Sequence, residues 1–63
     1  MEAYQQRVVD ESIELGAKIE KLREFLGSSI YDDLDRVQRE LLLIQFVYME
    51  NYADILTKRI ALF

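Results

Sequence analysis

The chain contains no cysteine, no histidine and no proline, and it has only two glycines. Without cysteine no disulfide can form, and without cysteine and histidine the usual zinc and haem ligands and the commonest general base are missing. The candidate nucleophiles Ser12, Ser28 and Ser29 therefore have no histidine to activate them. We expect a protein that is not an enzyme, with no catalytic residue, no metal site and no cofactor.

An excess of positive charge is also missing. The 8 Lys and Arg residues against 12 Asp and Glu residues give 8 − 12 = −4, which argues against general binding of polymeric nucleic acid. The longest apolar run, Leu41 to Ile44, is far shorter than the ~20 residues that cross a bilayer. No signal peptide is apparent. We therefore expect a cytoplasmic protein without a membrane partner.

The short length of the chain, 63 residues, limits the core that it can form. Below about 70 to 80 residues a lone core contributes only a few kcal/mol, and a disulfide, a metal or a partner usually adds the rest. Disulfides and the usual structural metals are excluded here, so self-association is the remaining source of stability. We expect a homo-oligomer.

The distribution of helix-breaking residues predicts two long helices. The one serious break is Gly27-Ser28-Ser29, so residues 1–63 are predicted to form a single domain with helices over roughly residues 3–26 and 36–61 and a short helical turn between them. Asp35, with Gln38 three residues later, predicts the N-cap of the second helix. The short connection makes the helices antiparallel. The predicted fold class is all-α: a helical hairpin that assembles into an oligomeric bundle.

Apolar residues follow helical spacing on both segments and predict which faces meet. The stripe on the first segment is interrupted at Glu11 and Ser12 and consists of Tyr4, Val8, Leu15, Ile19, Leu22 and Leu26. The stripe expected to face it consists of Val37, Leu41, Ile44, Tyr48, Tyr52 or Ile55, and Leu62. A second apolar set on the same segment is expected to be buried between chains: Leu42, Phe46, Met49, Leu56 and Ile60.

Most charged residues have an ordinary structural explanation. Acidic residues 32, 33 and 35 stand at the start of the second helix, where the helix dipole favours negative charge. Glu14 precedes Lys18 by four residues and Asp54 precedes Lys58 by four, as in ordinary surface pairs. Tyr4 either closes the end of the apolar stripe or offers a ring for stacking. A ring beside Arg7 is what a nucleobase with its phosphate would need.

The order of residues in both halves resembles the anti-CBASS and anti-Thoeris helical-hairpin family of phages. In the first half the resemblance is carried by Tyr4 to Glu11, Glu14-Leu15, Lys18-Ile19, Lys21-Leu22 and Phe25. In the second half it is carried by Tyr31, Leu34, Gln38, Leu41-Leu42, Gln45, Met49, Tyr52, Ile55-Leu56, Arg59-Ile60 and Phe63. The resemblance implies a phage protein, typically a hexamer, that sequesters cyclic di- and trinucleotide signals of bacterial immunity without cleaving them.

By the same resemblance, Tyr4 stacks on a base, and Lys18 of a neighbouring chain binds phosphate. Lys21 is an alternative to Lys18, and Arg7 contributes to either kind of pocket. Arg59 is the candidate for a separate pocket near the end of the second helix, with Lys58 as its alternative.

Two other functional classes stay open on the sequence. An oligomerisation or adaptor hairpin would use its surplus apolar face to bind a protein. An enzyme that hydrolyses the messenger is the least favoured reading, since the chain offers neither His nor Cys.

Overall fold

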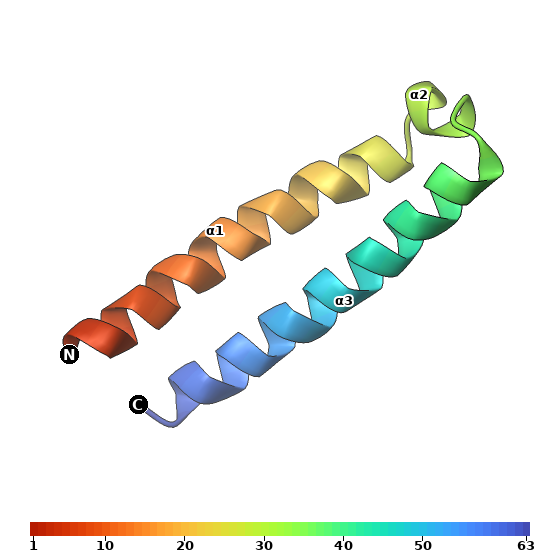
Figure 1. Ribbon diagram of the computed structural model, residues 1–63. Helices are drawn as coiled ribbons and strands as arrows, with labels where there is room; N and C mark the ends of the chain where they lie inside the picture. The colour runs from red at the N-terminus through yellow and green to blue at the C-terminus, as the bar shows by residue number, and fades with distance from the viewer.

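The computed structural model describes residues 1–63 and consists of two long helices joined by a short one (Figure 1). The helices are α1 (Ala3–Leu26), α2 (Ser29–Asp32) and α3 (Arg36–Ala61). Helices α1 and α3 run side by side in opposite directions, so both chain ends lie at the same end of a hairpin with extents of 46 × 15 × 14 Å. The predicted all-α hairpin is confirmed. Neither long helix holds a segment long and apolar enough to traverse a lipid bilayer.

Local hydrogen bonds fix the connection between the long helices. The hydroxyl of Ser28 accepts from the backbone N–H of Tyr31 at 3.3 Å and caps α2. The carboxylate of Asp35 accepts from the N–H of Gln38 at 2.7 Å and caps α3 as predicted. The phenol of Tyr31 then donates to the carbonyl of Arg39 at 3.2 Å, which ties the connection to the first turn of α3.

The core of the hairpin is narrow. Val8, Leu15 and Ile19 of α1 and Leu56 of α3 are the buried residues, and Leu56 has no exposed surface. Partly buried side chains of α3 pack against this cluster and, together with Leu56, follow spacings of three and four residues. They are Phe46, Met49, Ala53 and Ile60. Four buried residues are a small core for a folded chain, as expected of a hairpin that lacks an interior of its own.

The predicted facing stripe of α3 was wrong. The residues that face α1 belong to the set that was expected to be surplus, and Phe46, Met49, Leu56 and Ile60 pack on the core. Much of the stripe that was expected to face α1 lies outside instead, with Ile44 51 % exposed and Tyr48 69 % exposed. We call this exposed set the outer stripe; it consists of Val37, Leu41, Ile44, Tyr48, Asn51 and Ile55.

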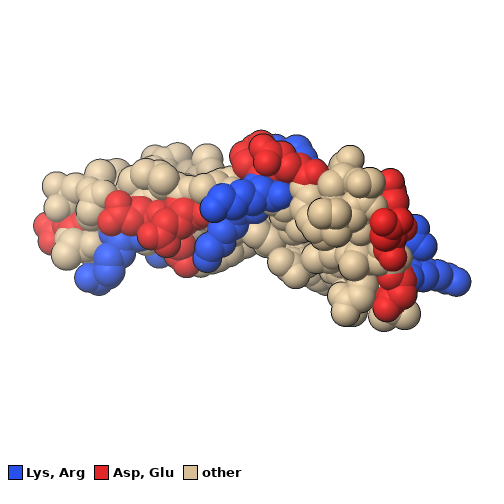
Figure 2. Space-filling model, turned by 90° about the horizontal axis from the view of Figure 1, so that it is seen from above, with Lys and Arg blue, Asp and Glu red and all other residues tan.

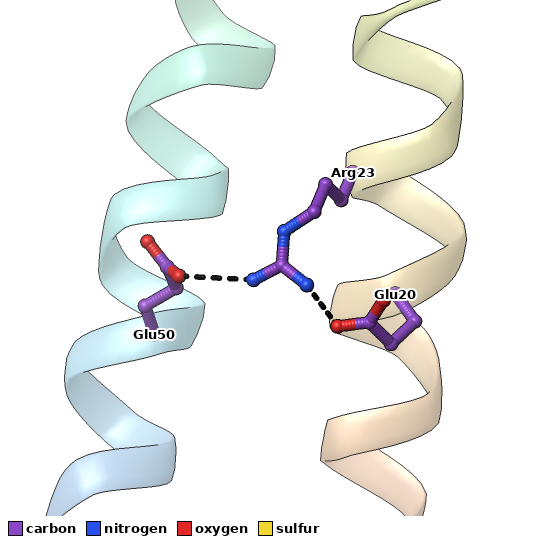
Figure 3. A network of polar contacts seen from close by, with 3 residues as sticks. All are labelled: Glu20, Arg23 and Glu50. Atoms are coloured by element: carbon purple, nitrogen blue, oxygen red, sulfur yellow. Dashed lines mark hydrogen bonds and ion pairs between the residues drawn. The ribbon is translucent and has the colours of Figure 1, made fainter.

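Polar contacts on both sides of the seam, the contact surface between α1 and α3, explain why α3 turns this face toward α1. On one side, Tyr52 donates to Glu11 at 2.6 Å. On the other, Arg23 reaches from α1 to Glu50 of α3 at 3.3 Å and also pairs with Glu20 (Figure 3). The guanidinium group of Arg23 also lies over the ring of Phe46, 5.5 Å from its centroid. Neighbouring helix positions differ by about 100°, so a rotation that turned the outer stripe inward would break both contacts.

Candidate functional site

An open concavity lies at the end of the hairpin where the two chain ends meet. Six of its lining residues come from the first half of α1, and one comes from the last turn of α3. They are Tyr4, Arg7, Val8, Asp10, Glu11, Glu14 and Arg59. Three of the predicted site residues, Tyr4, Arg7 and Arg59, are therefore brought together although 55 positions separate the first from the last in the sequence (59 − 4 = 55).

Tyr4 is held at this end without being buried. Its ring makes an edge-to-face contact with Phe63, with centroids 6.0 Å apart and planes at 80°. Its hydroxyl accepts from Nε2 of Gln5 at 3.5 Å, at the limit of a hydrogen bond. Since 53 % of Tyr4 is exposed and the residue lies outside the core cluster, much of its ring is accessible for stacking.

Arg7 and Arg59 supply the positive charge of the concavity. None of the ion pairs in the chain involves either residue. A guanidinium group carries five N–H donors in a planar fork that matches phosphate. Two guanidinium groups that are free of carboxylate partners, beside an accessible aromatic ring, can bind a phosphate and the base attached to it.

Three carboxylates share the concavity, and the sequence analysis did not assign them to the site. They belong to Asp10, Glu11 and Glu14. Glu11 accepts a hydrogen bond from Tyr52, and this bond, with a smaller effect of desolvation, raises the pKa of the Tyr52 phenol above its ordinary value. The spacing of seven between Tyr4 and Glu11 could have revealed that Glu11 belongs to the site, because residues seven apart share one edge of a helix.

The structure contains no cluster of His, Cys, Asp or Glu side chains that could hold a metal ion.

The charge balance of the concavity is unfavourable for an anion bound to one chain alone. Two guanidinium groups against three carboxylates give 2 − 3 = −1. On the face shown in Figure 2, acidic and basic side chains are likewise interleaved, without a continuous basic surface. The concavity of one chain therefore carries no net positive charge that would attract an anion.

The other predicted cations do not line this concavity. Lys18 follows Tyr4 by fourteen residues, or about 21 Å along the same helix, and it does not line the concavity that holds Tyr4. Lys21 lies farther along α1. Neither lysine forms an ion pair within the chain, so the pair expected between Glu14 and Lys18 is not formed.

Lys58 differs from its neighbour Arg59. Its Nζ lies 2.8 Å from the carboxylate of Asp54, which forms the predicted surface pair, and its side chain is 75 % exposed. The hydrogen bond to Asp54 and the charge of that carboxylate raise the pKa of Lys58. Of the two alternatives for a pocket at the end of α3, only Arg59 lines the concavity.

A second, more apolar groove runs along the outer stripe of α3. It is lined by Leu43, Ile44, Val47, Tyr48 and Asn51. It contains no charged side chain, so its chemistry suits another apolar helix face better than a phosphorylated ligand.

Comparison with known proteins agrees with a small phage protein. The chain is 48 % identical over 63 residues to an uncharacterized 7.5 kDa protein in the denB-rIIB intergenic region of Enterobacteria phage T4, covering all of this chain and 98 % of that one. No solved structure matches the chain. The sequence model of the Sequestin family, whose name denotes sequestration, matches residues 2–62. This match covers nearly the whole chain, which therefore belongs to the Sequestin family.

Proposed function

We propose that this protein binds and sequesters cyclic di- and trinucleotide second messengers of bacterial anti-phage immunity and does not cleave them. It acts in the cytoplasm of the infected host, where binding lowers the free concentration of the signal. The observation that supports this function most directly is the meeting of Tyr4, Arg7 and Arg59 in one concavity of a Sequestin family member.

The chemistry of the concavity suits one half of a cyclic dinucleotide. The ring of Tyr4 is accessible for base stacking, which contributes about 1 to 3 kcal/mol per base. The guanidinium groups of Arg7 and Arg59 have no competing ion pair within the chain, and charge-assisted hydrogen bonds contribute about 1.5 to 3 kcal/mol each. These contributions, made to both halves of the ligand, suffice for nanomolar affinity after ordering costs.

A homo-oligomer, in our proposal a hexamer, completes the site. A cyclic dinucleotide has approximate two-fold symmetry, so two copies of the chain related by a two-fold axis can give each half the same residues. The second copy supplies Lys18 or Lys21, which offsets the carboxylates of the concavity. A three-fold axis would suit a cyclic trinucleotide in the same way. Arg59 lines the same concavity as Tyr4, and we propose that it contacts a trinucleotide as well where three copies meet.

The outer stripe of α3 is the surface through which we propose that the copies associate. Its residues follow spacings of three and four, and their exposed fractions include 64 % for Val37 and 55 % for Leu41. The stripe thus repeats the pattern of a coiled-coil seam, which a second copy of itself can complement. Asn51 interrupts it with one amide, a residue type that specifies register when it is buried in such a seam.

A panel of ligands tests the proposal. The melting temperature of the protein is measured with cyclic di- and trinucleotides and with linear dinucleotides as controls. A cyclic ligand at 100 times its dissociation constant should stabilise each site by about 2.7 kcal/mol. An unchanged melting temperature with every cyclic ligand, together with no heat of binding in calorimetry, would contradict the function.

The matched variants Lys18→Ala and Lys21→Ala identify the lysine that binds phosphate. The variant that removes it should weaken binding and reduce the salt dependence of the affinity, because a screened charge contact is lost. The other lysine variant serves as the control, since it removes the same charge from the same helix.

A second candidate function is an adaptor hairpin that uses the outer stripe to bind a different protein. The apolar groove beside Ile44 and Tyr48 is the observation that favours it. Sedimentation of the pure protein separates the two functions. A chain that sediments as a folded monomer would favour the adaptor, whereas an oligomer that binds cyclic nucleotides would favour sequestration.

A further inference from the structure

Phe63 is the one aromatic side chain in edge-to-face contact with the ring of Tyr4. It follows α3, and its backbone N–H donates to the carbonyl of Ile60 at 3.0 Å, so its position is tied to the last turn of that helix. Phe63 itself does not line the concavity. We infer that Phe63 is a positioning residue that holds the ring of Tyr4 ready to stack on a base. This inference rests on the proposed function.

The contact geometry leaves the stacking surface of Tyr4 available. The two rings meet at 80° with centroids 6.0 Å apart, so the edge of one ring meets the face of the other. In either arrangement Phe63 covers at most one face of the Tyr4 ring. The 53 % exposure of Tyr4 agrees with a ring that is contacted without being covered.

The position of Tyr4 in the chain explains why such a contact matters. Tyr4 is the second residue of α1, and the backbone of this turn is held by a cap in which Glu2 N–H donates to Oε1 of Gln5 at 2.9 Å. The ring itself lies outside the core cluster, and a ring that loses rotational freedom when it binds reduces the affinity. The hydrogen bond from Gln5 is too long to fix the ring strongly. The contact with Phe63 joins the first turn of α1 to the end of α3 and thus orders the ring before the ligand arrives.

The test is a set of variants titrated with a cyclic dinucleotide by calorimetry. Phe63→Ala should weaken binding roughly two- to ten-fold, the range expected for one aromatic pair, while Phe63→Tyr should restore it. Leu62→Ala is the matched control, because Leu62 is adjacent and 87 % exposed, and its affinity should equal that of the wild type. In a Tyr4→Ala background, Phe63→Ala should have no further effect on affinity. Equal or tighter binding by Phe63→Ala in the wild-type background would overturn the inference.

A second measurement does not depend on any ligand. Nuclear magnetic relaxation of the Tyr4 ring carbons reports the order of that side chain, and we expect greater ring mobility in Phe63→Ala than in the wild type and in Leu62→Ala. An equally ordered Tyr4 ring in Phe63→Ala would overturn the positioning role. If the wild type binds no cyclic nucleotide, the proposed function fails, and the relaxation measurement still decides whether Phe63 orders Tyr4. Sedimentation of each variant should show an unchanged assembly. The changes in affinity and in ring relaxation then arise from the Tyr4 ring and not from a change of oligomeric state.

Discussion

The phenol of Tyr52 donates a 2.6 Å hydrogen bond to the carboxylate of Glu11, which joins residues 41 positions apart in the sequence. The bond lies on the edge of the seam between α1 and α3, and Glu11 also lines the concavity that holds Tyr4 and Arg59. The hydrogen bond therefore helps to fix which face of α3 meets α1, and it involves a residue that lines the candidate site. The interruption of the α1 stripe at Glu11 is explained by this partner on the facing helix.

This hydrogen bond predicts a specific dependence of stability on pH. The phenol of Tyr52 has a pKa raised above its ordinary value of 10.0 in the folded protein, mainly because it donates to Glu11. A raised pKa contributes stability that is complete below the unfolded pKa and is lost as the pH rises through the folded one. The wild type should therefore melt at a higher temperature than Tyr52→Phe near neutral pH, and the difference should shrink as the pH rises above about 10 and through the higher pKa of the folded protein.

Thermal melts from neutral pH to above pH 10 check the prediction, with Tyr4→Phe, measured without ligand, as the matched control. The Tyr4 hydroxyl makes only one long hydrogen bond, to Gln5, and Tyr4 lies outside the outer stripe, so loss of its hydroxyl should not produce the same pH dependence. The pKa of Lys58 is also raised, but Lys58 is present in all three proteins. The effect of its titration on the melting temperature therefore cancels when the proteins are compared. A constant difference between wild type and Tyr52→Phe would refute the role of the bond.

Assembly should depend on the outer stripe. Ile44→Glu should dissociate the oligomer, because it places a charge in an apolar contact between chains. Ile13→Glu is the matched control, since Ile13 is 68 % exposed and lies on α1, away from the stripe. Analytical ultracentrifugation at micromolar concentration should show a smaller species for Ile44→Glu only. Phe46→Glu is not suited to this test: Phe46 packs on the core within one chain, so this change should unfold the hairpin itself.

Stacking on Tyr4 should depend on the ring and not on the hydroxyl. Tyr4→Ala should cost about 1 to 3 kcal/mol of binding free energy for a cyclic dinucleotide. Tyr4→Phe should cost little, because the ring face is kept and the hydroxyl makes only one long hydrogen bond, to Gln5. Calorimetric titration measures both. If Tyr4 only closed the end of the hairpin, Tyr4→Ala would lower the melting temperature without a selective loss of affinity.

Arg59 and Lys58 form a natural pair for testing the cyclic trinucleotide pocket. Arg59→Ala should weaken trinucleotide binding by about 1.5 to 3 kcal/mol, the range for hydrogen bonds to charged groups. Lys58→Ala should leave the affinity close to that of the wild type, because Lys58 is already paired with Asp54 and does not line the concavity. The two variants are compared by titration with one trinucleotide. A larger effect of Lys58→Ala than of Arg59→Ala would reverse the assignment.

The bound messenger should be recovered intact. The protein is incubated with a cyclic dinucleotide, then heat-denatured, and the released nucleotide is analysed by chromatography. A chain without histidine or cysteine lacks the commonest general base and the strongest nucleophile, so we expect the cyclic form alone at every time point. Linear product that accumulates with time, and that depends on the amount of protein, would support a hydrolase instead.

The sequence by itself was sufficient to predict the hairpin. The hairpin depends on local features, namely the break at Gly27-Ser28-Ser29, the absence of proline and the cap at Asp35. Helix propensity and capping hydrogen bonds depend only on residues close together in the sequence. The candidate role of Tyr4 came with the resemblance, and the unpaired state of Arg7 became visible only in three dimensions.

Only the tertiary structure decided which face of α3 meets α1. The two apolar stripes of α3 are offset by one residue, which corresponds to a rotation of the helix by about 100°. Hydrophobicity alone does not decide which of the two stripes faces α1. The choice depends on contacts between residues far apart in the chain, Tyr52 with Glu11 and Arg23 with Glu50. The same long-range packing places Arg59 in the concavity with Tyr4 and leaves Lys58 outside it. The direction in which a residue of α3 points relative to α1 is decided only when the rotation of α3 against α1 is fixed.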